Sequence, residues 1–411
     1  IKTAMNTYLT SVIENVKKKH GNEPEFVQTV EEVFSSLEPV IEKHPEYEKV
    51  DLLNRMVEPE RMFTFRVSWE DDQGQWHTNI GYRCQFNGAL GPYKGGLRFQ
   101  ANVYPGIIKF LGFEQIFKNS LTGLPIGGGK GGADFDPAGK SDAEIMRFCQ
   151  AYMQALYRYI GPDVDVPAGD MGVGGREIGY LFGEYRRLKG AWENGVLTGK
   201  GFSYGGSLIR PEATGYGAVY YLQNVLEHEG ERIAGKTIAC AGFGNVTWGI
   251  CKKATQLGAK VVTLSGPDGY IYDPDGVATE EKIAYLVEMR SSGRNRVQDY
   301  AEKFGVEFFP GEKPWGVKAD VVMPSAMQND VHMEQAKQIA ANGVKYYIEV
   351  ANMPTTNDAL RFLMEQPGMI VAPSKAVNAG GVATSALEMA QNSERLVWTA
   401  EEVDAQLHRI M

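Results

Sequence analysis

The sequence predicts an α/β protein of two domains, a mixed-sheet domain followed by a Rossmann-like, doubly wound domain. Three observations lead to this prediction. The chain has 411 residues, and an ordinary domain has roughly 100 to 200. Residues 62–86 alternate as in a β-hairpin and precede a glycine-rich stretch. From residue 236 onward, short apolar strands alternate with helical patterns, as in a parallel sheet. We expect the domains to cover residues 1–205 and 206–411, with the C-terminal segment returning toward the first.

The composition describes a globular protein and excludes several classes of function. Hydrophobic residues make up 43% of the chain and aromatic residues 11%, which argues against global disorder. The formal net charge is -9, and an acidic balance argues against an extended nucleic-acid surface. Neither a signal peptide nor an apolar run of membrane-spanning length is evident. We therefore expect a cytoplasmic protein with no nucleic-acid and no membrane partner.

The cysteines predict neither a metal site nor a disulfide framework. They form no CxxC motif, and only the last two stand near each other in the sequence. A free cysteine packs as a small hydrophobic side chain. We expect reduced, mostly buried thiols at all four positions, which are Cys84, Cys149, Cys240 and Cys251.

The first domain is expected to begin with helices and continue into a sheet. Residues 1–60 place apolar side chains at helical spacing among charged ones, which suits surface or subunit-contact helices. Residues 62–67 and 76–86 are rich in Phe, Thr, Val and Tyr, and the turn at 71–74 separates them as a hairpin. Glycines then recur beside lysines and aspartates over residues 94–175, a density of turn residues that is unusual for plain scaffold.

The second domain is expected to contain a βαβ unit and further parallel strands. An apolar strand from residue 236 runs into a glycine turn, and a helical pattern covers 248–257. The next strands are predicted at residues 259–264, 317–323 and 346–350. Residues 399–411 resemble an amphipathic helix without a stop signal, so we expect a further C-terminal helix beyond the chain.

The glycine turn predicts a dinucleotide site. In Gly242-Phe243-Gly244-Asn245-Val246-Thr247, the first two glycines permit a tight turn and a close approach of backbone to a pyrophosphate at a helix N-terminus. Thr247 stands where the motif usually has Gly or Ala. It should push the helix away from the strand or need compensation, for which Gly249 is the candidate.

NAD is favoured as the cofactor, with NADP as the alternative. The second strand of the unit ends at Ser265 and not at the acidic residue that commonly binds the ribose hydroxyls, and Asp268 is the nearest substitute. Residues 265–275 contain no Arg or Lys to bind a 2′-phosphate. Arg290 and Arg294 would change this preference if they folded back onto the site.

Three lysines of the first domain predict an anion-binding site. Glycines stand on both sides of Lys130, two glycines follow Lys94, and Lys118 lies in a helical segment. Gln115 precedes Lys118 by three positions, so the two share a helix face and can grip one carboxylate together. Burial near other cations would lower a lysine pKa toward catalytic usefulness. Lys130 does not belong to a phosphate loop, because Leu124 replaces the required glycine and no Ser or Thr follows the lysine.

Asp170 is the candidate acid-base partner of these lysines. Aspartates in glycine turns usually only form the turn. The glycines around Asp170 leave room for a substrate, which favours proton transfer beside a lysine.

Six motifs resemble those of the hexameric bacterial glutamate dehydrogenases, in the Glu/Leu/Phe/Val dehydrogenase family. They occur in the family's order and extend over essentially the whole chain. The motifs are PYKGGLRF, LPIGGGKGG, VPAGDMGVG, RPEATGYG, AGFGNV and NAGGVATSALEM. The resemblance implies reversible oxidative deamination of L-glutamate to 2-oxoglutarate and ammonia, with hydride transfer to NAD(P), in a homohexamer.

The resemblance also implies roles for the site residues. Lys94, aided by Ser385, would hold the side-chain carboxylate, and Lys118 with Gln115 the α-carboxylate. Lys130 would be the catalytic lysine and Asp170 the proton shuttle. The remaining expected contacts are to the dinucleotide, from Thr214, Gly242, Gly244, Asn245, Val246, Ser265, Asp268 and Asn378.

Two other functions remain open at this point. A leucine, valine or phenylalanine dehydrogenase would share the fold and the catalytic pair, but its apolar substrate would leave the charge of Lys94 uncompensated. A dinucleotide-sensing protein without activity would be expected to lack a chemical group. All five are present, namely Lys94, Lys118, Lys130, Asp170 and Ser385.

Overall fold

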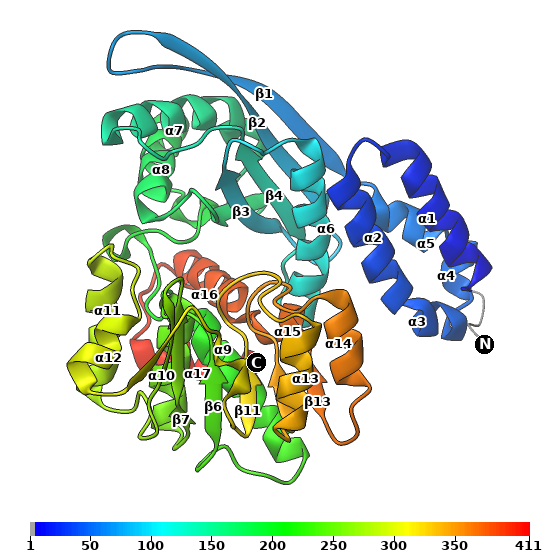
Figure 1. Ribbon diagram of the computed structural model, residues 1–411. Coiled ribbons are helices and arrows are strands. Elements are labelled where there is room, and N and C mark those ends of the chain that lie inside the picture. The colour runs from blue at the N-terminus through cyan, green and yellow to red at the C-terminus, as the bar shows by residue number, and fades with distance from the viewer. Residues whose placement is uncertain (1–4) are drawn as a thin grey trace. The chain divides into compact units, whose positions relative to one another are not determined.

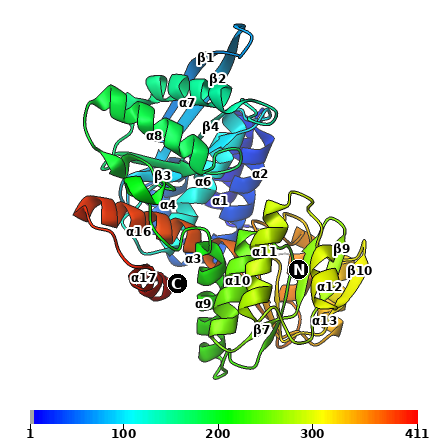
Figure 2. The same ribbon diagram turned by 90° about the vertical axis from the view of Figure 1, so that its left-hand side faces the viewer.

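A computed structural model describes residues 5–411, which divide into two compact units (Figure 1, Figure 2). The first unit extends to Leu208 and also takes in Ser385–Trp398. The second comprises Ile209–Thr384 and Thr399–Met411. The chain thus leaves the first unit at residue 208, where the sequence suggested 205. Helix α16 (Gly380–Glu394) begins in the second unit and ends in the first.

The first unit contains a mixed sheet of five strands in the order β1-β2-β4-β3-β5. Strand β2 runs antiparallel to its two neighbours, β1 and β4. Strand β3 runs parallel to both β4 and β5. The predicted hairpin is confirmed as β1 and β2, which extend beyond helix α7 (Figure 1, Figure 2). The strands are β1 (Arg61–Glu70), β2 (Trp76–Asn87), β3 (Tyr93–Phe99), β4 (Gly128–Ala133) and β5 (Asp165–Gly169).

Helices cover both faces of this sheet. Helices α7 and α8 bury an aromatic core that includes Phe99, Phe148 and Tyr152. Helix α6 covers the other face with α1 and α2, around Phe26, Phe86 and others. The helices are α1 (Thr7–His20), α2 (Pro24–Ser36), α3 (Glu38–Lys43), α4 (Glu46–Lys49), α5 (Leu52–Val57), α6 (Pro105–Leu121), α7 (Asp142–Leu156) and α8 (Gly175–Lys189), with short 3-10 turns η1 (Tyr157–Tyr159), η2 (Asn194–Val196) and η3 (Phe202–Tyr204).

The second unit contains the expected parallel sheet, in the order β13-β12-β11-β6-β7. Strand β6 pairs with β7 on one side and with β11 on the other, so the chain reverses its direction of growth across the sheet at β6. In doubly wound sheets, ligands bind at the carboxyl ends of the strands at such a point. The strands are β6 (Thr237–Cys240), β7 (Lys260–Val261), β11 (Val321–Met323), β12 (Tyr346–Ile348) and β13 (Ile370–Ala372).

Helices pack on both faces of the parallel sheet, which confirms the doubly wound prediction. One core lies under α9 to α12, and the other lies under α13 and α14 around Trp315. Helix α17 packs on α9. The helices are α9 (Ala213–His228), α10 (Asn245–Gln256), α11 (Glu280–Ser291), α12 (Gln298–Phe304), α13 (Met333–Ala341), α14 (Asn357–Met364), α15 (Ser374–Val377) and α17 (Ala400–Ile410), with the 3-10 turn η4 (Pro314–Gly316).

The strand predicted at 259–264 is split. Strand β7 ends at Val261, and the chain then enters a small antiparallel sheet in the order β10-β9-β8, which sequence alone did not predict. Its strands are β8 (Thr263–Gly266), β9 (Gly269–Tyr272) and β10 (Glu307–Pro310). This sheet carries Ser265 at the carboxyl end of the βαβ unit.

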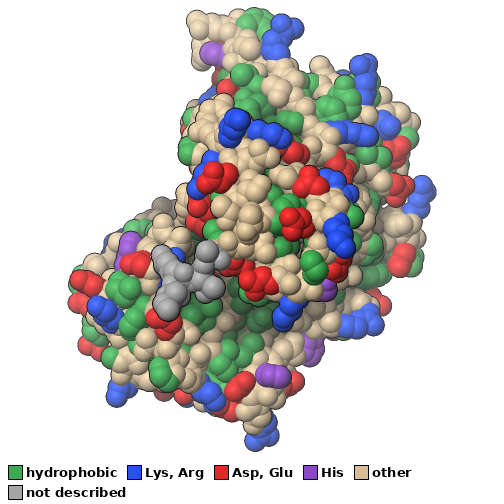
Figure 3. Space-filling view, turned by 90° about the vertical axis from the view of Figure 1, so that its right-hand side faces the viewer, with side chains coloured by type: hydrophobic (Ala, Val, Ile, Leu, Met, Phe, Trp, Pro, Cys, Tyr) green, Lys and Arg blue, Asp and Glu red, His purple; other side chains and the backbone are tan. Residues whose placement is uncertain are grey.

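The surface and the cysteines agree with the composition. Acidic and basic side chains are interspersed over the face drawn in Figure 3. Within residues 5–411, no helix has both the length and the apolar character needed to cross a bilayer. All four cysteines are buried free thiols, as predicted. Burial raises the pKa of Cys84 and of Cys240 to about 12.

Candidate active site

The sheet of the first unit brings Lys130 and Asp170 together. Lys130 lies in the middle of β4, and Asp170 follows the last residue of β5. Strand β3 lies between the two strands and pairs with both. The Nζ atom of Lys130 is 3.3 Å from the Oδ2 atom of Asp170, although the residues lie on different strands. The predicted acid-base pair is therefore an ion pair with a buried lysine.

A third charged group, Arg98 of β3, completes this cluster. Its Nε atom donates a hydrogen bond of 2.9 Å to the same Oδ2 atom of Asp170. The strand register explains this contact. Leu97 is opposite Gly169 of β5, so Arg98 and Asp170, which follow them, lie beside each other. Sequence reasoning missed Arg98.

The surroundings shift the pKa values of both members of the pair. Burial lowers the pKa of Lys130 below that of an ordinary lysine; the carboxylate of Asp170 partly opposes this, and the charge of Arg98 adds to the lowering. Burial alone would raise the pKa of Asp170, but the charges of Lys130 and Arg98 outweigh burial and hold it below the usual value. Lys130 thus loses its proton more readily than an ordinary lysine, and Asp170 holds a proton less readily than an ordinary aspartate.

Lys94 is a buried cation with polar neighbours. Its exposed fraction is 1%, and it lies on β3 four residues before Arg98, on the same face of the strand. Its Nζ donates to the carbonyl of Val166 at 3.1 Å and to the hydroxyl of Thr198 at 2.8 Å. Thr198 is fully buried and was also missed by sequence reasoning.

Helix α6 packs against β3 and places Gln115 close to it: a Cβ added to Gly95 would lie 3.4 Å from the Cγ atom of Gln115. Gln115 donates to Asn119 at 2.7 Å. Asn119 is fully buried and donates to the backbone carbonyls of Lys94 and Gly127. Asn119 thereby ties the helix to the strand. Lys118 lies on the same helix, partly exposed, three residues after Gln115.

Ser385 lies on α16, in the part of that helix that belongs to the first unit. A buried ion pair fixes this part: the Nζ of Lys200 is 2.9 Å from the Oε2 atom of Glu388. Glu388 also accepts hydrogen bonds from the backbone of Gly199 and Ser207. These contacts anchor the helix turn that carries Ser385 to residues 199–207, next to Thr198.

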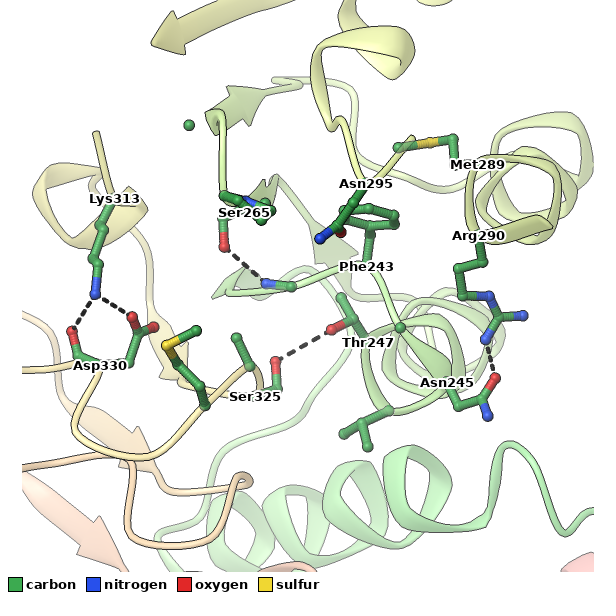
Figure 4. Close-up of a pocket in the computed structure, with 18 of the residues that line it drawn as sticks. Phe243, Asn245, Thr247, Ser265, Met289, Arg290, Asn295, Lys313, Ser325 and Asp330 are labelled. Atoms are coloured by element: carbon green, nitrogen blue, oxygen red, sulfur yellow. Dashed lines mark hydrogen bonds and ion pairs between the residues drawn. The ribbon is translucent and has the colours of Figure 1, made fainter. Parts of the chain in front are cut away.

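The second unit contains a cavity of about 670 Å³ at the carboxyl ends of β6 and β11 (Figure 4). It includes four of the predicted dinucleotide contacts from the glycine turn, together with Ser265. Gly242 has a φ of 79°, a conformation that favours glycine. Helix α10 begins at Asn245, so its N-terminus borders the cavity and offers unpaired backbone N–H groups to an anion. Residues from the turn that line it are Gly242, Phe243, Gly244, Asn245, Val246 and Thr247.

Thr247 does not need the compensation that the sequence suggested. Its side chain is buried, and its hydroxyl donates to the carbonyl of Ala241 at 2.8 Å, while Ser325 lies 3.5 Å away (Figure 4). Gly249 serves a different purpose: a Cβ there would lie 2.6 Å from the carbonyl of Glu212, so this glycine permits close packing of α10 against the start of α9.

The structure separates the two expected ribose contacts. Ser265 lines the cavity, and its hydroxyl accepts a hydrogen bond of 2.8 Å from the backbone of Gly242. Asp268 is not among the residues that line it. Its two carboxylate oxygens accept 3.0 Å hydrogen bonds from the backbone of Val297 and Gln298, at the start of α12. Asp268 as a ribose contact stays a prediction, and in the structure its carboxylate also caps the start of α12.

Two basic residues lie at the cavity, one of them expected. Arg290 lines it and hydrogen-bonds the side-chain oxygen of Asn245 (Figure 4). Lys313, which sequence reasoning missed, lines it on another side and pairs with Asp330. Arg294, the other expected arginine, instead pairs with Asp299 at 2.7 Å.

The last two predicted cofactor residues also lie in the second unit. Thr214 is near the start of α9, and a Cβ added to Gly381 would lie 2.9 Å from its hydroxyl. Asn378 is buried and donates to the carbonyl of Val350 and to Asn352. Its Oδ1 atom is buried and finds no hydrogen-bond partner within the described part of the chain. Such an acceptor suits an amide donor from a ligand.

Comparisons with known proteins place the chain in a family. The model for Glutamate/Leucine/Phenylalanine/Valine dehydrogenase matches residues 205–411, and that for the Glu/Leu/Phe/Val dehydrogenase dimerisation domain matches residues 59–187. The NAD-specific glutamate dehydrogenase of Clostridium symbiosum is 70% identical over 407 residues, 99% of this chain and 90% of that protein. The NADP-specific glutamate dehydrogenase of Haemophilus influenzae is 55% identical over 403 residues, 98% of this chain and 89% of that protein.

A solved structure gives the same result for the fold. A glutamate dehydrogenase structure, 70% identical in sequence, has a TM-score of 0.95 and a match covering 98% of this chain and 90% of that one. With two family models covering most of the sequence, this chain belongs to the Glu/Leu/Phe/Val dehydrogenase family.

Proposed function

We propose that this chain is a glutamate dehydrogenase, which converts L-glutamate, water and NAD into 2-oxoglutarate, ammonia and reduced NAD, and also runs the reverse amination. The observation that carries the proposal is the buried polar cluster around Lys94, whose strand β3 pairs with β4, the strand of Lys130. Its buried cation and hydroxyl suit a carboxylate, whereas an apolar side chain would leave these polar atoms desolvated. The names of the relatives support the same activity.

Two anchors would orient the substrate. Lys94, with Thr198 beside it and Ser385 on α16, would bind the side-chain carboxylate. Lys118 and Gln115 on α6 would bind the α-carboxylate. Fixing both ends of a dianion restricts its rotation and presents one face of the Cα atom for reaction.

Lys130 and Asp170 would carry the protons. Asp170 would first take a proton from the ammonium group of the substrate. NAD, when bound, would supply the acceptor for the hydride of Cα, whose loss turns the substrate into an iminium ion, the protonated imine. Lys130 in its neutral form takes a proton from the water that adds to the imine carbon. Asp170 passes a proton to the departing nitrogen, so that ammonia leaves and the carbonyl forms. The ion pair between the two residues lets a proton move from the lysine back to the carboxylate.

The cavity of the second unit would hold the dinucleotide. The glycine turn and the α10 N-terminus suit the pyrophosphate. The unpaired Oδ1 atom of Asn378 suits the carboxamide of the nicotinamide, with Thr214 as a further contact. NAD is favoured because Asn245 and Asp330 already pair with the cavity's two basic side chains, Arg290 and Lys313, and so compete with a 2′-phosphate.

The assembly and compartment follow as further parts of the proposal. The family's helical N-terminal region builds a homohexamer, and α1 to α5 provide such a region here. Four buried thiols without a disulfide suit the reducing cytoplasm.

Initial rates of nicotinamide reduction test the function. The chain should turn over glutamate with NAD faster than with NADP. The variant Lys94→Leu should lose activity on glutamate far more than on norleucine, whose side chain is apolar. Equal losses on both substrates would refute glutamate as the substrate, and absence of turnover by folded protein would refute the enzyme.

A further inference from the structure

Asp170 has two cationic partners, and the proposed chemistry uses only one. Lys130 and Arg98 approach the same Oδ2 atom, at 3.3 Å and 2.9 Å. The side chain of Arg98 is only 17% exposed, so its charge acts in a poorly solvated setting. Burying each charged group costs desolvation free energy. The presence of a second cation beside Asp170 therefore calls for a role that offsets this cost.

We propose that Arg98 is a positioning residue for the proton-transfer pair: its Nε–H fixes the Asp170 carboxylate so that Oδ2 faces Lys130. A carboxylate after the end of a strand can otherwise rotate about its side-chain bonds. The Nε–H bond fixes one oxygen, and the parallel register of β3 with β5 holds the arginine at the required position. This inference rests on the proposed function, since it assigns a task within the same reaction.

The charge of Arg98 also sets the protonation of the pair. It acts on both groups in the same direction, because a nearby cation disfavours the ammonium and favours the carboxylate. Loss of this charge should raise the pKa of Lys130 and of Asp170 together. The pH profile of deamination, which needs the neutral amine, should then move to higher pH.

Other charges around the pair are accounted for. Arg83 of β2 also lowers the pKa of Lys130, and its own charge is balanced by Asp165 at the start of β5. Helix α6, which packs on β4, meets Lys130 with Gly112 and carries Glu114 and Lys118 further along. Strand β3 carries Lys94 besides Arg98. Changing Arg98 alone leaves all of these groups in place.

The variants Arg98→Gln and Arg98→Lys test the proposal in the full-length protein, with kcat and KM for glutamate measured across pH. Arg98→Gln should lower kcat about 10- to 100-fold and change the KM for glutamate less than about threefold. Its profile should move upward by about one pH unit. Arg98→Lys keeps the charge and should restore the position of the profile, with kcat still reduced because a lysine lacks the Nε–H at that place.

A matched control and a second readout separate this role from a merely structural one. Arg147 on α7 also donates from Nε, to the carbonyl of Glu70, and pairs with Asp72, so Arg147→Gln should leave the profile unmoved. The pH dependence of Lys130 acetylation by acetic anhydride, followed by peptide mass spectrometry, reports the lysine pKa without turnover. It should also shift upward in Arg98→Gln.

Distinct outcomes overturn distinct claims. An unmoved profile in folded Arg98→Gln, or an equal shift in Arg98→Lys, would overturn the role of Arg98. If Arg98→Gln does not fold, a displaced profile in Arg98→Lys overturns it, and a lowered kcat at an unmoved profile supports it. If the parent chain has no turnover while the acetylation profile shifts, the proposed function fails and the electrostatic effect of Arg98 stands.

Discussion

Arg83 and Asp165 form a fully buried ion pair beneath the candidate active site, with both carboxylate oxygens bound by guanidinium nitrogens. The Nη1 atom of Arg83 also donates to the carbonyl of Gly95, next to Lys94. Gln85 donates to Asp165 as well. The pair therefore connects β2, β3 and β5. Strand β2 pairs with the strand of Lys130, β3 carries Lys94, and Asp170 follows β5.

Asp165→Asn should strongly destabilise the first unit. The substitution leaves the Arg83 guanidinium buried without its counter-charge, which typically costs about 3–5 kcal/mol. Chemical denaturation of the variant should show a lower unfolding midpoint. Asp142→Asn, which removes the exposed partner of Arg176, is the control and should hardly shift the midpoint. Equal stabilities for the two variants would contradict the importance of the buried pair.

Lys130→Met should abolish most of the proposed chemistry while keeping the substrate anchors. We expect kcat to fall about 100- to 10,000-fold, because general-base catalysis is lost. In the parent, the lowered pKa of Lys130 means that deamination should rise with pH and level off below 10.5, the ordinary lysine value. If the deamination rate of the parent protein still increased above that pH, Lys130 would not be the group that controls the rise of the rate with pH.

Gly242→Ala should weaken NAD binding specifically. The φ of 79° strains any side chain, and the new Cβ would lie 3.2 Å from the Thr247 hydroxyl at the cavity. Gly230→Ala provides a matched control in the same unit, since its φ of 75° imposes similar strain and its Cβ meets no atom within 4 Å among the described residues. Both variants should lose about 1–2 kcal/mol of stability. Only Gly242→Ala should raise the KM for NAD.

Glu388→Gln should affect the substrate more than the cofactor. Glu388 holds Lys200 and the backbone of two loop residues, and it lies one helical turn after Ser385. Loss of its charge leaves Lys200 without its buried counter-ion. We expect lower thermal stability and a higher KM for glutamate, with the KM for NAD nearly constant. A parallel rise of both constants would contradict a local anchoring role.

Local sequence patterns were sufficient to predict the hairpin, the βαβ unit and the lysines next to glycines. The β1–β2 hairpin, the βαβ unit and Lys130 each depend on features within a few tens of residues. Arg98 and Thr198 were missed because their partners are distant in sequence: Asp170 lies 72 positions from Arg98, and Lys94 lies 104 positions from Thr198. Such pairs depend on strand register and loop packing, which no local pattern encodes.

Asp268 has hydrogen-bond partners that the sequence did not predict. Its position after the second strand fits the cofactor motif, but the chain first enters an unexpected antiparallel sheet. That turn directs the carboxylate to two backbone N–H groups at α12. Helix α7 was also overlooked although its start is marked locally, since Ser141 and Glu144 form a reciprocal capping box.

The buried thiols allow the opening of each unit to be measured separately. Cys84 and Cys149 lie in cores of the first unit, whereas Cys240 and Cys251 lie in a core of the second. A thiol reagent can reach such a side chain only when the surrounding core opens, so labelling rates report the opening of each unit by itself. Each unit thus contains two cysteines whose labelling rates report its own opening. Maleimide labelling followed by peptide mass spectrometry should show which unit unfolds first.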